Sequence, residues 1–208
     1  MQYKWLNKQN NKNLIVFFNG WGMDERIVSS LNSVNFDVIV FYDYRNMHFE
    51  SCDFSKYDKK YLIAWSMGVY VCNYFYEYFK NFDKLVAING TQSPIDDNYG
   101  IPSKIYDITV NNFNEMSCSK FMKKISATVD LKGYSSRSVQ NLKDELVAIK
   151  NLKIDKFLNF NKVILSTKDR IFPFENMMNF WSKQQVDIIK TEKAHYLFDS
   201  YKNWSDFI

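Results

Sequence analysis

The chain has 208 residues, of which 46% are hydrophobic, and its formal net charge at pH 7 is +4. This length suits a single domain with a substantial core, and the hydrophobic content excludes an intrinsically disordered protein. The mild charge argues against a dedicated nucleic-acid binder, which needs a denser basic stripe. It remains compatible with docking of an acidic protein partner.

The cysteines and the N-terminal sequence exclude several other classes. The three cysteines are widely spaced and form no C-x-x-C pair, so neither a zinc ribbon nor a redox motif is predicted. The N-terminal residues contain no apolar run that resembles a signal-peptide core. No window approaches the ~18 consecutive apolar residues of a membrane span. We therefore expect a cytoplasmic protein that does not associate with membranes.

Short, continuous apolar runs alternate with helical patterns along most of the chain. We predict strands at residues 14–18, 36–42, 61–65, 84–89, 162–166 and 186–189. We predict helices at residues 24–33, 67–80 and 175–183, and again after His195. Continuous apolar runs are typical of strands buried on both faces, and their alternation with helices indicates βαβ units. The predicted fold class is α/β, with a mostly parallel sheet and helices on both faces.

Residues 91–160 interrupt this alternation. The segment contains two amphipathic stretches, at residues 117–125 and 136–152, with apolar side chains at helical spacing. An insertion of this size is typical of a helical cap over the carboxyl ends of the strands, where open α/β sheets bind ligands. Two ordinary packing helices fit the same periodicity. We expect one domain over residues 1–208 with the cap inserted at about 91–160.

A candidate nucleophile lies between a predicted strand and a predicted helix. Residues 64–68, Ala-Trp-Ser-Met-Gly, approximate the G-x-S-x-G turn that projects a serine above an α/β sheet. Ala64 stands where the first glycine is usual. The helix that follows Ser66 contributes the positive end of its dipole, which favours negative charge developing at the site. Ser66 is therefore the predicted nucleophile.

The order of residues along the chain selects the catalytic base. In hydrolases with this turn the sequence order is serine, then acid, then histidine. The chain has two histidines, and His48 precedes Ser66, so only His195 fits that order. For His48 a role outside catalysis is expected. His195 follows the last predicted strand, which suits a base on a loop at the same sheet edge.

The acid is expected directly after the penultimate strand. Asp169 lies three residues beyond the apolar run at 162–166, where its carboxylate could orient His195 and stabilise the imidazolium. Glu175 and Asp187 are the rival acids. Glu175 is expected to begin a helix and Asp187 lies within a predicted strand, so Asp169 is the preferred acid.

Two backbone N–H groups are candidates for an oxyanion hole. One belongs to Met67, directly after the nucleophile. The other is assigned to Trp21, in the loop after the first apolar run, where Gly20 and Gly22 allow the backbone to turn its N–H groups outward. The Trp21 side chain is also expected to form a wall of the acyl pocket. A plain strand-to-helix turn is the alternative interpretation of this loop.

With these residues assembled, the chain resembles the BioG group of pimeloyl-[acyl-carrier protein] methyl ester esterases, a shortened branch of the α/β-hydrolases. The resemblance is carried by residues 17–24 (Phe-Phe-Asn-Gly-Trp-Gly-Met-Asp), by residues 64–68 and by the segments around Asp169 and His195, with weaker similarity at residues 100–102 and 137–146. Together these segments extend through nearly the whole chain. The resemblance implies a compact α/β-hydrolase fold with a small helical cap.

The resemblance also implies a role in biotin synthesis. The enzyme would hydrolyse the methyl ester of pimeloyl-[acyl-carrier protein] and release methanol through an acyl-enzyme on Ser66, chemistry that needs neither a metal nor a cofactor. The carrier protein of this pathway is acidic, so basic cap residues are candidates for its docking site, namely Lys132, Arg137 and Lys143. A monomer that binds no nucleic acid is expected.

Two alternatives share parts of this evidence. A general carboxylesterase or thioesterase acting on small acyl esters would use the same triad, and the acyl carrier could be coenzyme A. A hydrolase-like fold retained as a binding module would have no catalytic activity. Ser66, Asp169 and His195 are all present, which favours an enzyme.

Overall fold

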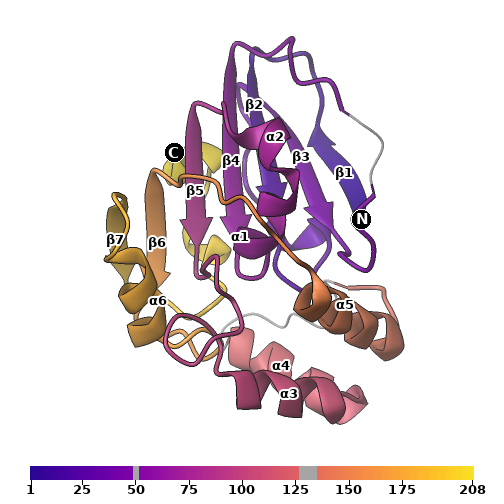
Figure 1. The fold of residues 1–208 in the computed structure, drawn as a ribbon. Coiled ribbons are helices and arrows are strands. Elements are labelled where there is room, and N and C mark those ends of the chain that lie inside the picture. Colours follow the sequence, from indigo (N-terminus) through magenta and orange to yellow (C-terminus); the bar gives the residue numbers. More distant parts are fainter. Residues whose placement is uncertain (49–51, 127–134) are drawn as a thin grey trace.

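A computed structural model describes residues 1–48, 52–126 and 135–208. In these ranges one seven-stranded sheet has the strand order β1-β3-β2-β4-β5-β6-β7 (Figure 1). The strands are β1 (Gln2–Asn7), β2 (Asn13–Phe18), β3 (Phe36–Tyr42), β4 (Lys59–Trp65), β5 (Lys84–Ile88), β6 (Lys162–Ser166) and β7 (Asp187–Thr191). All neighbours pair in parallel except β1, which runs antiparallel to β3. The predicted α/β class with a mostly parallel sheet is confirmed.

The predicted strands correspond to β2 through β7, whereas β1 was not predicted. The interior strands are detectable because both of their faces are buried, as in β2, where five of the six residues are fully buried. β1 lies at the edge of the sheet, and none of its residues is fully buried. Its sequence therefore lacks the continuous apolar run by which the other strands were recognised.

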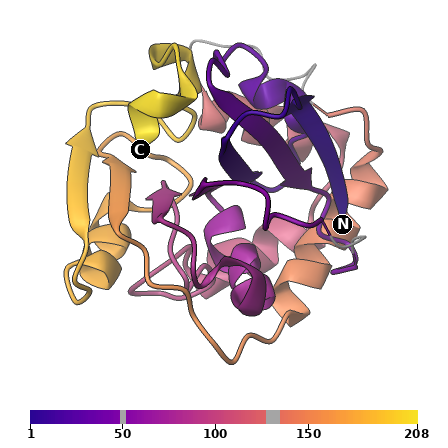
Figure 2. The same cartoon turned by 90° about the horizontal axis from the view of Figure 1, so that it is seen from above.

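Layers of short helices cover both faces of the sheet (Figure 2). One face, which includes Val16 and Phe18, packs against α1, α2 and α6. The other, which includes Ile15 and Phe17, packs against 3₁₀ turns. The helical segments are α1 (Gly68–Val71), η2 (Cys72–Phe75), α2 (Tyr76–Phe79) and α6 (Phe174–Trp181), and the turns on the second face are η1 (Glu25–Val28), η4 (Phe198–Ser200) and η5 (Trp204–Phe207).

Three predicted helices are more irregular than their sequences indicated. The helix expected at 67–80 is divided into α1, η2 and α2, and Asn73 in η2 turns its amide back to the carbonyl oxygens of Val69 and Tyr70. Such local side-chain hydrogen bonds compete with a regular helix. The helix expected at 24–33 is reduced to η1. The helix expected after His195 is replaced by η4 and η5, whose aromatic side chains are buried in the second face.

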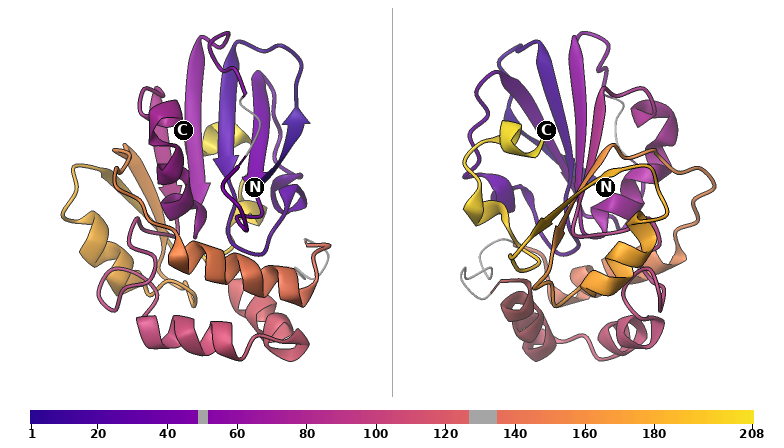
Figure 3. Two further views of the ribbon diagram at one scale, coloured as in Figure 1. Left: turned by 45° about the vertical axis from the view of Figure 1, so that its right-hand side comes forward. Right: turned by 90° about the vertical axis from the view of Figure 1, so that its left-hand side faces the viewer.

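In its described residues, the segment between β5 and β6 contains three helices beside the carboxyl ends of the parallel strands (Figures 1 and 3). They are α3 (Ser103–Asn111), α4 (Glu115–Ile125) and α5 (Val139–Asn151). The two predicted amphipathic stretches correspond to α4 and α5. α3 was not predicted, because it is rich in β-branched residues of low helix propensity. It is tied to α5 by a hydrogen bond from Tyr106 Oη to the carbonyl oxygen of Leu146, at 2.9 Å.

Within the described ranges, no helix combines the length and the apolar character that crossing a membrane requires.

Candidate active site

Ser66 lies in a left-handed turn between β4 and α1. Its φ of 58° is rare for a residue other than glycine and marks a strained strand-to-helix turn. The turn is held by a hydrogen bond of 2.9 Å from Ser66 N to the carbonyl oxygen of Ile88. A Cβ on Gly68 would lie 2.4 Å from the carbonyl oxygen of Phe18, so only glycine fits there. Ala64, by contrast, is accommodated as a buried residue of β4, and its departure from the motif leaves the turn intact.

Ser66, His195 and Asp169 form one hydrogen-bonded chain. Ser66 Oγ lies 2.9 Å from His195 Nε2, and His195 Nδ1 lies 2.7 Å from Asp169 Oδ2. The three side chains come from the loops after β4, β7 and β6, which meet because carboxyl ends of parallel strands share one edge of the sheet. The structure thus brings together the three residues that the sequence selected.

The carboxylate of Asp169 is fixed by its own loop. Its Oδ1 accepts hydrogen bonds from the backbone N–H groups of Ile171, at 2.7 Å, and Phe172, at 3.0 Å. The other oxygen, Oδ2, is directed at His195. The rival acids are exposed elsewhere, Glu175 in the first turn of α6 and Asp187 at the start of β7. Asp169 is therefore the acid whose geometry suits orientation of the histidine.

The His195 ring is buried among aromatic side chains and its backbone is held from two directions. The ring contacts Trp65 and is parallel to the ring of Phe172, with centroids 5.2 and 6.0 Å away. The backbone carbonyl oxygen of His195 accepts hydrogen bonds from Trp65 Nε1, at 3.1 Å, and from Asn89 Nδ2, at 2.9 Å. These contacts fix the loop as well as the ring, which limits the imidazole to the orientation seen. His48, in contrast, is exposed.

Asn89, which the sequence pattern indicated only as the end of a strand, connects two of these loops. It follows β5 in a left-handed conformation with φ 45°. Its amide nitrogen donates to Ser166 Oγ, at 2.8 Å, and its amide oxygen accepts from Ser166 N, at 2.7 Å. The same amide nitrogen reaches His195, so one buried side chain holds the end of β6 to the histidine loop. An asparagine before Gly90 at a strand end was the available signal, because asparagine tolerates this conformation.

The loop formed by residues 19–24, here called the 19–24 loop, approaches Ser66 from β2. Its first residue is held by three contacts: Asn19 Oδ1 accepts from Gly20 N, Asn19 Nδ2 donates to the carbonyl oxygen of Asp24, and the Asn19 carbonyl oxygen accepts from Tyr44 Oη, each at 2.8 Å. Among the residues that the structure describes, the backbone N–H groups of Trp21 and Met67 have no protein acceptor. Both are therefore available to a ligand.

An apolar cavity opens beside Ser66 and His195. Its walls come from the 19–24 loop, from α3, α4 and α5, and from the loop after β6; they include Trp21, Ile105, Phe121, Leu146 and Ile171. The Trp21 ring packs edge-on against Phe121, with centroids 4.7 Å apart. Apolar walls with few polar groups suit an acyl chain. Two cationic residues, Lys124 and Arg170, also line this cavity and are exposed to solvent.

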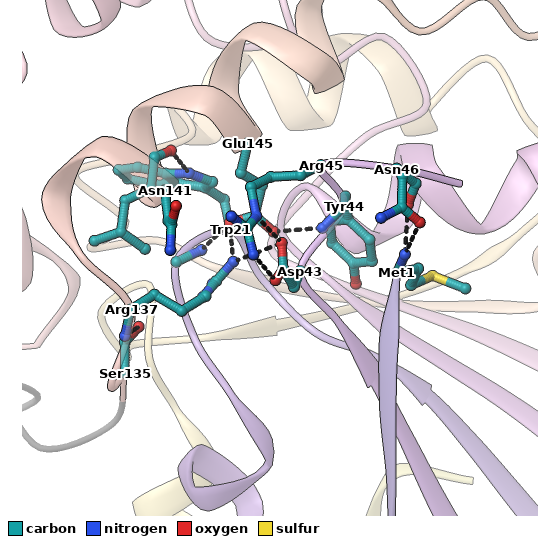
Figure 4. A network of polar contacts seen from close by, with 12 residues as sticks. Met1, Trp21, Asp43, Tyr44, Arg45, Asn46, Ser135, Arg137, Asn141 and Glu145 are labelled. Atoms are coloured by element: carbon teal, nitrogen blue, oxygen red, sulfur yellow. Dashed lines mark hydrogen bonds and ion pairs between the residues drawn. The ribbon is translucent and has the colours of Figure 1, made fainter. Parts of the chain in front are cut away.

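The basic residues expected to dock a carrier protein lie in different environments. Arg137 does not lie free on the surface: its side chain is 9% exposed, and Nη1 lies 2.8 Å from Glu145 Oε2 and 3.3 Å from Asp43 Oδ1 (Figure 4). A charge engaged inside the protein is not free to meet a partner. Lys143 is half-exposed on α5, and Lys132 lies outside the described residues.

Glu145 is the other functional candidate that was not predicted from the sequence. Its carboxylate is fully buried on α5. It accepts hydrogen bonds from the backbone N–H groups of Gly22 and Tyr44, at 3.2 and 2.9 Å (Figure 4). Burial raises the pKa of Glu145, while Arg137 and the two N–H groups favour its ionised form. The one signal in the sequence was an acidic residue on the otherwise apolar face of a predicted helix.

A serine, a base that contacts it and an acid that orients the base are the parts required for acyl transfer through a covalent intermediate. Across the three described ranges, no group of three or more His, Cys, Asp or Glu side chains is arranged to hold a metal ion.

Asp43, Arg45, Arg137 and Glu145 form an ion cluster behind the 19–24 loop. One member, Asp43, gives a pH-dependent prediction. Burial alone would raise the pKa of Asp43, but its hydrogen bonds to Arg45 and the nearby Arg137 hold the pKa below its ordinary value. The ionised carboxylate therefore contributes stability that is present above the unfolded-state pKa and lost as the pH falls through the folded-state pKa. Between about pH 5 and pH 2 we expect the Tm of the wild type to fall more steeply than that of Asp43→Asn. Parallel Tm profiles would contradict this assignment.

Comparison with known proteins gives consistent results. The family model described as pimeloyl-ACP methyl esterase BioG matches residues 1–207. A malonyl-[acyl-carrier protein] O-methyltransferase of Bacteroides fragilis is 37% identical over 195 residues, which are 89% of this chain; the chain thus spans only 40% of the length of that relative.

Solved structures show the same likeness. The crystal structure of BioG from Haemophilus influenzae superposes with a TM-score of 0.90 at 29% identity, covering 100% of this chain and 99% of that one. An esterase from Exiguobacterium antarcticum superposes with a TM-score of 0.69 at 13% identity, covering 95% of this chain and 88% of that one. The second likeness concerns the fold alone.

Proposed function

Because the chain belongs to the BioG family of pimeloyl-ACP methyl esterases, which are carboxylic ester hydrolases, we propose that it hydrolyses the methyl ester of pimeloyl-[acyl-carrier protein] in biotin synthesis. The observation that carries this proposal is the Ser66–His195–Asp169 chain beside an apolar cavity. The similarity to a protein named for methyl transfer to malonyl-[acyl-carrier protein] supports it, because that reaction forms the kind of ester removed here.

In the proposed mechanism Ser66 Oγ attacks the carbonyl carbon of the methyl ester while His195 Nε2 removes the proton of the Ser66 hydroxyl. Asp169 holds the ring and stabilises the imidazolium that forms. The negative charge of the tetrahedral intermediate is stabilised by the N–H groups of Trp21 and Met67. The imidazolium then protonates the departing methoxide, and methanol leaves an acyl-enzyme on Ser66. Water, deprotonated by His195, hydrolyses that intermediate to the free carboxylate and restores the serine.

The organisation of the chain suits this substrate. We propose that residues 1–208 form one hydrolase domain and that residues 91–160 act as its cap. The acyl chain would lie against the apolar walls, with the methyl ester at Ser66 and the carrier outside the cavity. α3 and α4 expose several lysines on the cap, namely Lys104, Lys120, Lys123 and Lys124. With Arg137 buried, these lysines and Lys143 form the proposed docking surface for an acidic carrier protein.

The substrate assignment is tested by presenting one methyl ester on two carriers. We expect kcat/KM for pimeloyl methyl ester on the acyl carrier protein to exceed that for the same acyl group on N-acetylcysteamine by about tenfold or more, because contacts with the carrier add binding energy. The product is methanol in both cases. Equal values would favour a general carboxylesterase, and release of the thiol in place of methanol would identify a thioesterase.

The docking surface is tested by charge reversal away from the catalytic residues. We expect Lys120→Glu combined with Lys123→Glu to raise KM for the carrier-bound ester about threefold or more at low salt, because surface charges guide association. The N-acetylcysteamine ester should react at an unchanged rate. Lys202→Glu, an exposed site near the C-terminus, is the control. If the double variant and this control give the same KM, the carrier does not dock on α4.

A further inference from the structure

We infer that Glu145 is a positioning residue: from the cap helix α5 it fixes the 19–24 loop, and with it the N–H of Trp21, beside Ser66. The inference rests on the proposed serine mechanism. It concerns a side chain that touches neither the cavity nor the three catalytic residues, and it assigns the cap a role in catalysis beyond covering the substrate.

Two hydrogen bonds join α5 to consecutive residues of the loop. Glu145 Oε2 accepts from Gly22 N at 3.2 Å, and the carbonyl oxygen of Leu142, one turn earlier on α5, accepts from Trp21 Nε1 at 2.8 Å (Figure 4). The first bond fixes the peptide group that follows Trp21, and the second fixes its ring. The orientation of the Trp21 N–H, which faces no protein acceptor among the described residues, is therefore set from both sides.

The loop needs this external support because its own conformation is one that few residues adopt. Gly22 has φ 81°, in the left-handed region, and a glycine loses the most backbone freedom on ordering. An acceptor for its N–H is the natural way to hold such a peptide in one orientation. Glu145 supplies that acceptor from an adjacent helix rather than from the loop itself.

The charge of Glu145 is held in place by the same cluster. Arg137 Nη1 lies 2.8 Å from Glu145 Oε2, and Arg137 Nη2 donates to the carbonyl oxygen of Met23 at 3.3 Å. Oε1 of Glu145 accepts from Tyr44 N after β3. One carboxylate thus connects α5, the 19–24 loop and the segment that follows β3. An ionised acceptor forms stronger hydrogen bonds than a neutral one, which explains a carboxylate at a buried position.

Loss of the Glu145 contact is expected to affect the chemical step and not the binding of the ester. A loop that is free to rotate leaves the cavity able to bind an ester but aligns the Trp21 N–H with the developing oxyanion less often. Interactions made mainly in the transition state change kcat rather than KM. Loss of the Glu145 contact should therefore lower kcat and leave KM almost unchanged.

The test compares Glu145→Leu, Glu145→Gln and Asp43→Asn in the full chain, with a p-nitrophenyl ester as substrate and a fluorophosphonate as a probe of Ser66. We expect kcat to fall about tenfold or more in Glu145→Leu and about threefold or more in Glu145→Gln, whose amide oxygen is a weaker acceptor. KM should stay within about twofold. The rate of fluorophosphonate labelling should fall in the same order, because the phosphonyl oxygen uses the same N–H groups.

Asp43→Asn is the matched control. It removes a negative charge from the same cluster, and Asp43 contacts Arg45 and Arg137 but not the 19–24 loop. Its kcat should stay within about twofold of the wild type even where its Tm falls. A kcat for Glu145→Leu equal to that of the wild type would overturn the inference. If Glu145→Leu does not fold, Glu145→Gln decides: a kcat no lower than that of Asp43→Asn overturns the inference.

The labelling reaction separates this inference from the proposed function. A wild type that does not react with the fluorophosphonate would contradict the serine mechanism and remove the basis of both. Equal labelling of the wild type and the Glu145 variants would leave the esterase mechanism standing and overturn only the role of Glu145.

Discussion

The left-handed backbone at Ser66 is the constraint on which the rest of the site depends. A φ of 58° at a serine is tolerated only where the surroundings hold it. Here β4 ends in a hydrogen bond from Ser66 N to the neighbouring strand, and α1 begins so close to β2 that a Cβ at Gly68 would collide with the Phe18 carbonyl oxygen. The strain is sustained by a sheet whose central strands are buried on both faces. This conformation places the serine hydroxyl beyond the edge of the sheet, within hydrogen-bonding distance of His195.

Three further loops converge on that serine, and each is held by contacts outside itself. Asn89 and Trp65 bind the carbonyl oxygen of His195, and Asn89 also binds the end of β6. α4 joins the same loop, because the Ile125 carbonyl oxygen accepts from Tyr196 N. α5 holds the 19–24 loop. α4 is thus attached to the histidine loop and α5 to the 19–24 loop, so both helices belong to the framework of the site as well as to its walls.

Much of this arrangement was predictable from the sequence because the relevant signals are local. Parallel strands buried on both faces leave continuous apolar runs, and a sharp turn requires small residues around Ser66. The order of the chain then left His195 as the one histidine able to follow the nucleophile, and placed Asp169 after the right strand. The edge strand β1 and the β-branched helix α3 lack such signals, since their structure depends on packing against neighbours.

The roles of individual polar side chains were less predictable. Arg137 was proposed for carrier docking on its charge and its place in the cap segment, but its partners, Asp43 and Glu145, come from segments that only the tertiary structure brings together. Asn89 resembled an ordinary strand end for the same reason. Sequence periodicity shows on which face of a helix a charged residue lies. The oppositely charged partner that allows it to be buried is known only from the tertiary structure.

Whether Ser66 hydrolyses this methyl ester is decided by the mass of pimeloyl methyl ester acyl carrier protein after incubation with the wild type and with Ser66→Ala. We expect the carrier to lose the mass of one methylene group with the wild type, as the methyl ester becomes a carboxylic acid, and to remain unchanged with Ser66→Ala. An unchanged carrier after incubation with the wild type would contradict the assigned substrate. Equal conversion by Ser66→Ala would contradict the serine mechanism.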